Sequence, residues 1–256
     1  MKKLLLVGIG VVLLSACGSG SFQVPKQEYQ SRVQVLGVLP LLVDQNSRPD
    51  YPQKDILFDM LARSAKDKHK ILSAQLKAKK GYFDVRTLTV NPQLTGMSML
   101  SEGKTTDDFG RPTGYRFDPA TVAEIAQQNV VDALLVVVLS GEKVTETRRS
   151  RTMLESLNTE YSDILATAAV VDRSGEVLWQ MNGKDSFQFL VLQYPDFDEA
   201  YFNRTDRVQV KNISLSGLER ALEEKAKKSA ELPKVYQELF REIVSGISPG
   251  LLDSLR

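Results

Sequence analysis

The chain has 256 residues, of which 42% are hydrophobic and 25% are charged. The 33 Lys and Arg residues nearly balance the 32 Asp and Glu residues, so no strong field would attract a polyanion, and we expect no nucleic-acid partner. The single cysteine and single histidine exclude a disulfide within the chain, a histidine-based catalytic triad and a multi-histidine metal site.

The first residues have the layout of a secretory signal peptide. Lys2 and Lys3 supply positive charge, and residues 4–14 form an apolar stretch that is shorter than the roughly 20 residues needed to cross a bilayer. Residues 1–16 are therefore expected to be removed. No later stretch of the sequence is apolar for long enough to form a membrane helix.

Cys17 completes a sequence that resembles the bacterial lipobox, in which Leu14, Ser15 and Ala16 are the residues that the signal peptidase recognises. The resemblance implies a diacylglyceryl cysteine, cleavage before Cys17, and a further acyl chain such as palmitate on the new amine. Two or three acyl chains hold a protein durably at a membrane, whereas one chain anchors it weakly. Apart from this covalent lipid, we expect no cofactor.

Gly18 stands where an aspartate would favour retention at the inner membrane. By this resemblance, the protein is a lipoprotein of the bacterial cell envelope, anchored to the outer membrane and facing the periplasm. Residues 17–31 are expected to form a lipidated flexible leash, because 18–30 are rich in Gly, Ser and Gln without an apolar period. Residues 32–256 are expected to form a single periplasmic α/β domain with C-terminal helices.

The domain is expected to begin with a buried strand over 33–40, which ends at Pro40. Apolar residues spaced by about four then predict a helix over 55–79, with Gly81 as its C-terminal stop. A second strand follows over 82–88. Residues 91–117 carry four glycines and two prolines, which predicts a long loop that is either functional or disordered.

Order resumes with Asp118 and Pro119, a helix cap followed by a favourable first helical residue. The aliphatic run 130–139 predicts a strand that is covered on both faces. Strands over 164–171 and 176–181 flank a four-residue turn and predict a hairpin. A further strand is expected over 187–192.

The C-terminal part is expected to be helical. Ser216 and Glu219 predict a capping box at the start of one helix, and Pro233 interrupts it. The last helix presents a core face, made of Tyr236, Leu239, Phe240 and Ile243. The predicted fold class is therefore α/β (α+β), a mixed β-sheet with helices packed on it, in the order strand, helix, strand, loop, helix, three strands and helices.

Three stretches in this order resemble a bacterial envelope module, and the similarity covers about 33–190. They are VLGVLPLLVD, LKAKKGYFDVRTL, and ALLVVVLSGE followed later by AAVVDRSGEVLWQ. The module occurs in CsgG-like curli-secretion-channel lipoproteins, in lipoprotein activators of peptidoglycan synthases, and in the N-terminal domain of the Tol-Pal translocation protein TolB. The resemblance implies a CsgG-like or TolB-N-terminal-like fold whose members bind proteins, assemble complexes or form secretion pores.

Few residues suggest catalysis. His69 lies among lysines in 66–70 and is expected to be a solvated surface residue. No G-x-S-x-G nucleophile motif is present, and the glycines at 8 and 10 leave with the signal peptide. A carboxylate-dependent glycan hydrolase stays open as an alternative, and its nearest candidate acids are Asp107, Asp108, Asp196, Asp198 and Glu199.

Four aromatic residues in 194–202 are the candidate partner contacts: Tyr194, Phe197, Tyr201 and Phe202. Interleaved with acids, they would form an exposed docking patch, or they would instead cover the end of the sheet. Arg148, Arg149 and Arg151 are expected to be a solvated basic cluster at a strand edge or, alternatively, a partner contact.

The sequence therefore predicts a lipid-anchored periplasmic protein that binds an unidentified protein partner in a cell-envelope complex, for assembly, secretion or regulation, and that is not an enzyme. A subunit of an outer-membrane secretion pore is the other alternative, and a homo-oligomer stays open. The charged segment 143–162 argues against a pore, because strands that face lipid on alternate positions would not carry so many charges.

Overall fold

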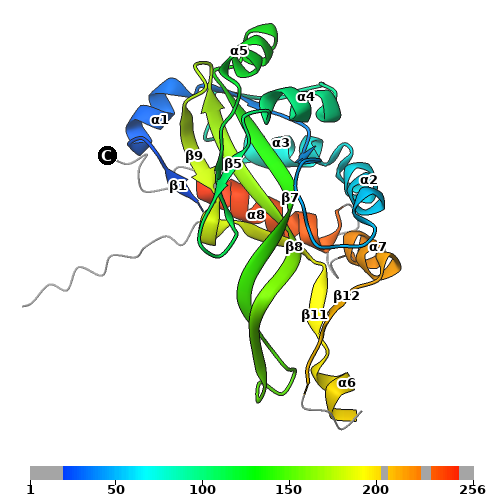
Figure 1. Cartoon of the computed structure of the whole chain (residues 1–256). Coiled ribbons are helices and arrows are strands. Elements are labelled where there is room, and N and C mark those ends of the chain that lie inside the picture. Colours follow the sequence, from blue (N-terminus) through cyan, green and yellow to red (C-terminus); the bar gives the residue numbers. More distant parts are fainter. Residues whose placement is uncertain (1–19, 203–206, 226–231, 248–256) are drawn as a thin grey trace, which may run out of the picture.

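A computed structural model describes residues 20–202, 207–225 and 232–247 (Figure 1). Cys17 and the lipobox residues Leu14, Ser15 and Ala16 lie outside the described residues, so the anchor stays a prediction. In the part of the chain that is described, no helix is both long enough and apolar enough to cross a bilayer.

The centre of the molecule is a mixed eight-stranded sheet in the order β1-β9-β8-β7-β2-β4, in which β10 also pairs with β8 and β3 with β7. The pairs β2–β4, β2–β7 and β3–β7 are parallel, and every pair that involves β8 or β9 is antiparallel. The strands are β1 (Ser21–Phe22), β2 (Val35–Val38), β3 (Leu42–Val43), β4 (Asp84–Thr87), β7 (Ala133–Arg149), β8 (Ser156–Asp172), β9 (Val177–Met181) and β10 (Phe187–Val191).

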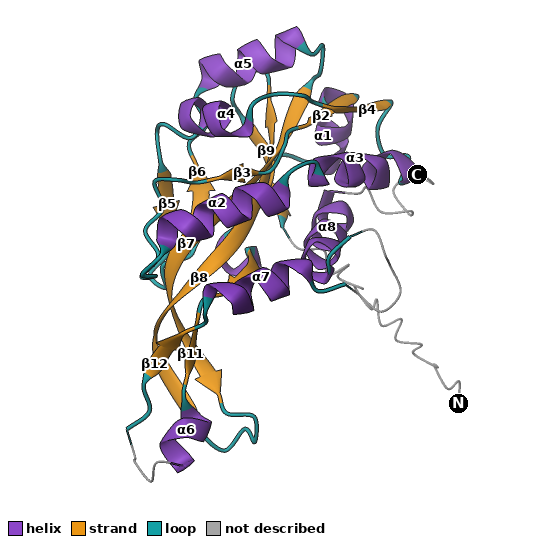
Figure 2. Cartoon of the chain, turned by 90° about the vertical axis from the view of Figure 1, so that its right-hand side faces the viewer, coloured by secondary structure: helices purple, strands orange, loops and turns teal. Residues whose placement is uncertain are grey.

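Helices cover both faces of this sheet (Figures 1 and 2). Alternate residues of β7 divide between the two sides: Leu135 and Val137 belong to one hydrophobic core, whereas Leu134 and Val136 belong to the other. The first core is closed by α1 (Lys26–Arg32), α2 (Lys54–Ala65), α3 (Lys68–Ala78), α7 (Leu215–Glu223) and α8 (Lys234–Ile247). The second is closed by α4 (Pro92–Met99), α5 (Pro119–Gln128) and the hairpin β5 (Lys104–Thr106)–β6 (Pro112–Tyr115).

Strands β7 and β8 form a hairpin that is much longer than the rest of the sheet. They pair over their full 17 residues, from Ala133 opposite Asp172 to Arg149 opposite Ser156. The first half of β7 and the second half of β8 are buried in the body, and residues 143–162 extend beyond it as a two-stranded arm (Figure 1). Beside the arm lie β11 (Gln193–Pro195), α6 (Phe197–Phe202) and β12 (Val210–Asn212) (Figure 2).

The predicted fold class is confirmed: the molecule is an α+β protein with helices packed on a mixed sheet. Residues 133–139 of the predicted aliphatic strand 130–139 form the buried start of β7, whereas Val130 is exposed in the turn before it, and the turn after Asp172 joins β8 to β9 as predicted. Helix α8 buries the four residues predicted for its core face, Tyr236, Leu239, Phe240 and Ile243.

The expectation of a flexible leash is wrong from Gly20 onward. Ser21 and Phe22 pair with β9, and residues 26–32 form α1. Tyr29 of this helix is buried, stacks edge-on with Phe22, and shares a 2.6 Å hydrogen bond with Tyr82. These three aromatic rings hold the segment on the body, which the Gly, Ser and Gln composition of 18–30 did not reveal.

The single helix expected over 55–79 is two helices, α2 and α3. The chain breaks at Lys66, which is extended, and at Asp67, which has a φ of 63°. The break changes the direction of the chain, so each helix presents its own apolar face to the first core.

The expectation of a long loop over 91–117 is also wrong. Asn91 caps α4 by accepting hydrogen bonds from the backbone N–H groups of Gln93 and Leu94, and β5 and β6 form a hairpin. Four large side chains from this segment are buried in the second core: Met99, Leu100, Tyr115 and Phe117.

The predicted capping box at Ser216 is two residues too late. Helix α7 begins after Ser214, whose side-chain oxygen accepts a hydrogen bond from the backbone N–H of Gly217. A serine at either position is a good N-cap, so the sequence alone did not choose between them.

Candidate partner-binding site

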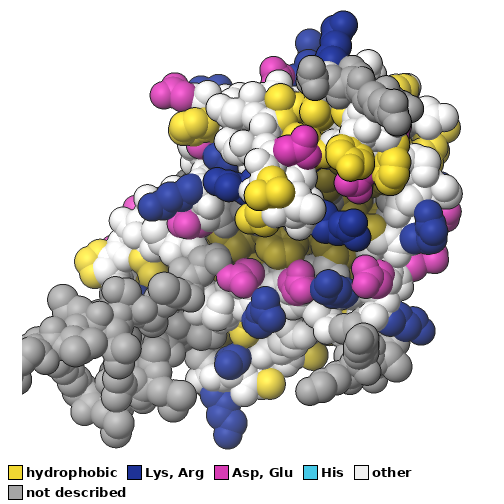
Figure 3. All heavy atoms as spheres, turned by 90° about the horizontal axis from the view of Figure 1, so that it is seen from below, with side chains coloured by type: hydrophobic (Ala, Val, Ile, Leu, Met, Phe, Trp, Pro, Cys, Tyr) yellow, Lys and Arg dark blue, Asp and Glu magenta, His cyan; other side chains and the backbone are white. Residues whose placement is uncertain are grey.

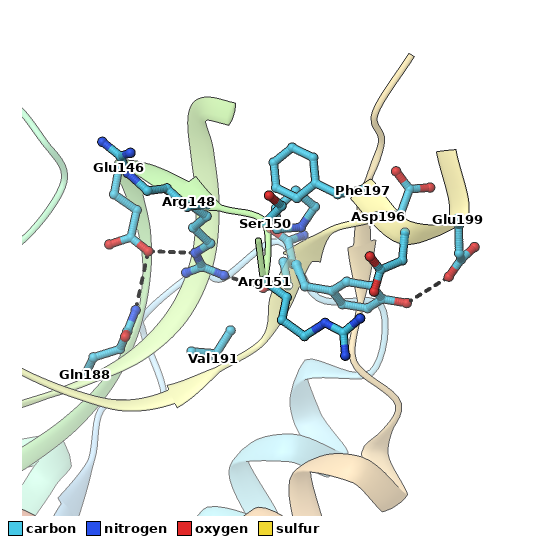
Figure 4. A pocket seen from close by; sticks show the side chains of 14 residues that line it. Glu146, Arg148, Ser150, Arg151, Gln188, Val191, Asp196, Phe197 and Glu199 are labelled. Atoms are coloured by element: carbon cyan, nitrogen blue, oxygen red, sulfur yellow. Dashed lines mark hydrogen bonds and ion pairs between the residues drawn. The ribbon is translucent and has the colours of Figure 1, made fainter. Parts of the chain in front are cut away.

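A cleft of about 600 Å³ separates the far half of the arm from the segment that carries β10, β11 and α6 (Figure 4). Most of the residues that line it are polar or charged, and both signs of charge are present. The lining residues are Glu146, Arg148, Arg149, Ser150, Arg151, Gln188, Val191, Gln193, Tyr194, Pro195, Asp196, Phe197, Asp198 and Glu199.

Arg148 does not belong to a solvated basic edge. Its guanidinium lies 2.6 Å from Asp163 and 2.7 Å from Glu146, donates to the carbonyl oxygen of Gln193, and stacks at 4.1 Å over the ring of Tyr161. The expectation of a solvated cluster is therefore wrong for Arg148. Arg149 and Arg151 are exposed, as that expectation required.

Asp163 is fully buried where the arm joins the sheet. Burial has the largest effect on the pKa of this carboxyl and raises it, and the hydrogen bonds from Arg148 and Gln188 oppose the rise. The amide of Gln188 donates to Asp163 at 2.7 Å, and the backbone N–H of Leu192 donates at 3.3 Å. This carboxyl therefore ties β8 to β7 and to β10, which fixes one wall of the cleft.

Helix α6 is held by Asp196, one of the carboxylates considered for catalysis. Asp196 is buried, accepts a 2.6 Å hydrogen bond from the backbone N–H of Gln209, and lies 3.2 Å from the ammonium of Lys211. The Gln209 N–H, with smaller help from Lys211, lowers the pKa of Asp196. This geometry keeps Asp196 ionised and gives it a positioning role at the start of α6.

The four aromatic residues proposed as partner contacts have different environments. Phe197 is only 6% exposed and lines the cleft together with Tyr194. Tyr201 is 77% exposed and Phe202 is 79% exposed, and their rings meet edge-on. The exposure that a docking patch requires is therefore found at Tyr201 and Phe202, and Phe197 is buried.

The tip of the arm adds two residues that the sequence analysis missed. Met153 is 63% exposed and Leu154 is 88% exposed, in a turn that Ser150 closes by accepting hydrogen bonds from the backbone N–H groups of Met153 and Glu155. The sequence did contain a signal for them, because two large apolar residues stand side by side within the otherwise charged segment 143–162.

We call Met153, Leu154, Tyr201 and Phe202 the distal surface. Both side views place the tip of the arm and α6 at the same end of the molecule (Figures 1 and 2). Seen from below, hydrophobic side chains lie among scattered basic and acidic ones, with a hollow that has a hydrophobic floor (Figure 3). Surfaces of this mixed kind are typical of protein interfaces.

The other candidate acids have different environments, and Glu199 pairs with Lys211, as Asp196 does. Asp107 accepts hydrogen bonds from the backbone N–H groups of Phe109 and Arg111 in the β5–β6 turn, and Asp108 and Asp198 are exposed. Across the described ranges, no group of three or more His, Cys, Asp or Glu side chains is placed to hold a metal ion.

His69 is a further correction. It is 5% exposed, not solvated, and its Nε2 lies 3.2 Å from the carbonyl oxygen of Leu88. The lysines around it in 66–70 hid the helical spacing of His69, Leu72 and Leu76, all of which face the interior.

No family model and no curated protein matches this chain. Solved structures that are similar to it include a PelC dodecamer from Paraburkholderia phytofirmans, which is 12% identical, with 86% of this chain and 90% of that chain covered and a TM-score of 0.34. A neuraminyllactose-binding hemagglutinin homolog from Helicobacter pylori is 10% identical, with 87% and 89% covered and a TM-score of 0.38.

A lipoprotein from Neisseria meningitidis is 13% identical, with 67% of this chain and 91% of that chain covered and a TM-score of 0.27. A bacterial lipoprotein is thus among the structural neighbours. Likenesses with TM-scores below 0.5 carry no argument about the function of this chain, and the resemblance to the CsgG-like and TolB module stays a prediction.

Proposed function

We propose that this chain is a lipid-anchored protein of the bacterial cell envelope that binds a protein partner through its distal surface and performs no catalysis. The lipobox that ends at Cys17 supports the anchor. The observation that carries the binding role is that large exposed apolar side chains lie on the tip of the arm and on α6, which are at the same end of the molecule.

Large exposed apolar residues gathered at one place are typical of interaction sites, and aromatic residues contribute strongly to interface energies. Tyr201 and Phe202 supply two adjacent rings, and Leu154 supplies an aliphatic side chain that is almost fully exposed. Burying one such side chain at an interface contributes about 1.5–3 kcal/mol, so a partner that covers all four would gain substantial affinity.

The charges around the distal surface favour a protein partner over a lipid bilayer. Glu155, Glu160, Asp198 and Glu199 are exposed on the arm or on α6, and Arg149 and Arg151 are exposed on the arm as well. Carboxylates are unfavourable at an anionic, apolar membrane interface, which selects Lys and Arg on the polar face. A protein surface of mixed charge complements this arrangement.

The position of the distal surface suits an anchored binding protein. Cys17 precedes β1 by only a few residues, and β1 is joined through β9 to the Val170 end of β8. The tip of the arm lies at the other end of β8, whose 17 residues span roughly 55 Å. The arm can therefore carry the distal surface several nanometres away from the lipid anchor.

The proposal is tested by Leu154→Asp and Phe202→Asp, with Phe83→Asp as the matched control. Phe83 is 86% exposed and lies beside β4, outside the distal surface. We expect that the envelope protein that cross-links to the wild type no longer cross-links to either distal variant, and that it still cross-links to the control. The thermal stability of both distal variants should be unchanged. Equal capture by all three variants would remove the assignment.

The anchor and the absence of catalysis have separate tests. Cys17→Ser should abolish incorporation of labelled palmitate and release the protein from the membrane fraction. A carboxylate-dependent hydrolase would lose its cellular function on Asp108→Asn or Asp198→Asn, whereas the binding role leaves both variants active. A secretion-pore subunit would instead give a detergent-stable ring, which mass measurement of the solubilised protein detects.

A further inference from the structure

A second cavity, of about 510 Å³, lies away from the distal surface and shares no lining residue with the cleft beside the arm. It is lined by residues of α2, α3 and the first turn of α4, three helices that can be located in Figure 2. Its size falls within the range of pockets that bind small molecules, about 300–1,000 Å³.

The topology of the sheet explains why a cavity forms at this place. Strands β2 and β4 are parallel neighbours, so their carboxyl ends meet at one edge, and residues 40–43 and 88–90 line the cavity just beyond them. Helices α2 and α3 pack on one face of the sheet and α4 on the other, so the two layers separate at this edge. Crevices at the carboxyl ends of parallel strands are the usual binding sites of open α/β sheets.

The walls of the cavity are mainly apolar. Leu41, Ala65 and Leu88 are buried, and Val43 and Val90 are partly buried against the cores on either side. An apolar molecule would displace water from these side chains without leaving a polar group of its own unpaired.

The rim of the cavity carries an excess of positive charge. Arg63, Lys66 and Lys70 line it together with Asp59 and Asp67. Asp67 is paired with Lys70 at 2.8 Å, and no ion pair between described residues involves Arg63 or Lys66. These two cations are therefore available to an anionic group at the mouth, with only the carboxylate of Asp59 opposing it.

His69 provides a further polar group in the wall. Its Nε2 donates to the carbonyl oxygen of Leu88, which leaves Nδ1 as an acceptor. Nδ1 is buried and has no hydrogen-bond partner among the described residues. A carboxylate has no proton to donate to this acceptor, so His69 forms part of the wall of the cavity and takes no part in recognising an anion.

We propose that this cavity binds a small amphipathic anion, such as a fatty acid, with its apolar body against Leu41, Leu88 and Val90 and its carboxylate at Arg63 and Lys66. The apolar walls supply most of the affinity, and the rim selects the sign of the charge. Neither the lipobox nor the distal surface enters this argument, so the cavity and the proposed function stand or fall separately.

The chain offers a built-in reporter, because His69 is its only histidine. Full-length lipidated protein in nanodiscs, labelled with ¹³C and ¹⁵N at histidine, gives one imidazole signal without assignment work. We expect octanoate to shift this signal in a saturable way, and octyltrimethylammonium at the same concentrations to leave it unchanged. Equal shifts from both probes, or none from octanoate, would overturn the proposal.

Variants locate the binding. Ala62 is exposed on α2 and lines the cavity, so Ala62→Trp fills it and should abolish the shift, whereas Ala120→Trp on the exposed face of α5 should not. Lys66→Gln should weaken octanoate binding up to about fivefold, and Lys79→Gln, beyond the cavity on the same helical segment, should leave it unchanged. Retained binding in Ala62→Trp would place the ligand elsewhere and contradict the proposal.

Discussion

Arg148 and Asp163 form a buried ion pair across β7 and β8, with Nη2 of the arginine 2.6 Å from Oδ2 of the aspartate. The aspartate side chain is fully buried, and the guanidinium is covered by Tyr161 on one side. Because Gln188 of β10 shares the same carboxylate, this pair joins three strands at the base of the arm. The direction of the arm, and with it the position of the distal surface, depends on this contact.

Arg148→Met should therefore destabilise the protein strongly. It removes the guanidinium and leaves the carboxylate of Asp163 buried without its charged partner, a change that costs about 3–5 kcal/mol in comparable sites. Equilibrium unfolding in urea measures the loss. The matched control is Lys143→Met, whose ammonium lies 4.0 Å from Asp50 and Glu160 at the surface and should cost less than about 1 kcal/mol. Equal losses in the two variants would show that the pair does not support the arm.

Two glycines with similar backbone conformations provide a test of the contact between the β5–β6 turn and the arm. Gly110 has a φ of 82°, and a Cβ added there would lie 1.9 Å from the carbonyl oxygen of Lys143. Gly103 has a φ of 77°, but a Cβ there would meet nothing within 4 Å. In both alanine variants the residue must adopt a left-handed conformation, which costs about 1–2 kcal/mol of stability. Any stability that Gly110→Ala loses beyond this amount therefore measures the clash with Lys143.

Gly110→Ala should accordingly lower the thermal midpoint well beyond Gly103→Ala, since the turn must move away from β7. Differential scanning calorimetry of the two variants provides the comparison. Similar midpoints would mean that the β5–β6 turn does not pack on the arm as described.

The stability of the protein should fall as the pH drops below neutrality because of His69. Burial has the largest effect on the pKa of this imidazole and lowers it from the ordinary value of 6.5. The unfolded chain therefore binds a proton near pH 6.5 that the folded protein does not, which favours unfolding as the pH falls from 6.5 towards the folded-state pKa.

His69→Gln should remove this part of the pH dependence while keeping a side chain that can donate to Leu88. The difference in unfolding free energy between the two proteins, measured from pH 7.5 to 5, isolates the histidine from the carboxylates, which both proteins share. A pKa of His69 at or above 6.5 by NMR titration would contradict the buried, neutral assignment.

The parts of the fold that could be predicted are those with a strong local pattern. The aliphatic run predicted as a strand at 130–139 is long enough to require cover on both faces, and the turn at 172–175 joins two strand-like segments, so the buried halves of β7 and β8, and β9, followed from the sequence. The four core residues of α8 repeat at helical spacing in a segment with no competing signal.

The errors have physical causes that can be traced to particular residues. In 91–117, Gly, Pro and Thr dominate the composition, and the few large residues that bury themselves, such as Met99 and Tyr115, are widely spaced. The arm was missed because the buried Val144 alternates with exposed charged or polar neighbours. This alternation has the period of two that is typical of a strand, but the high charge of the segment conceals it. The distal surface depends on the tip of the arm and α6, two segments far apart in the sequence, lying at the same end of the molecule, which no local pattern records.

The most direct test of the central claim is site-specific photocross-linking in cells that make the full chain. p-Benzoylphenylalanine placed at 154 and at 201 reports the distal surface, and the same group at 83 reports a solvent-exposed site beside β4. If the distal surface binds an envelope protein, positions 154 and 201 yield the same cross-linked protein and position 83 does not. Identical adducts from all three positions, or no protein adduct at 154 and 201, would contradict the account.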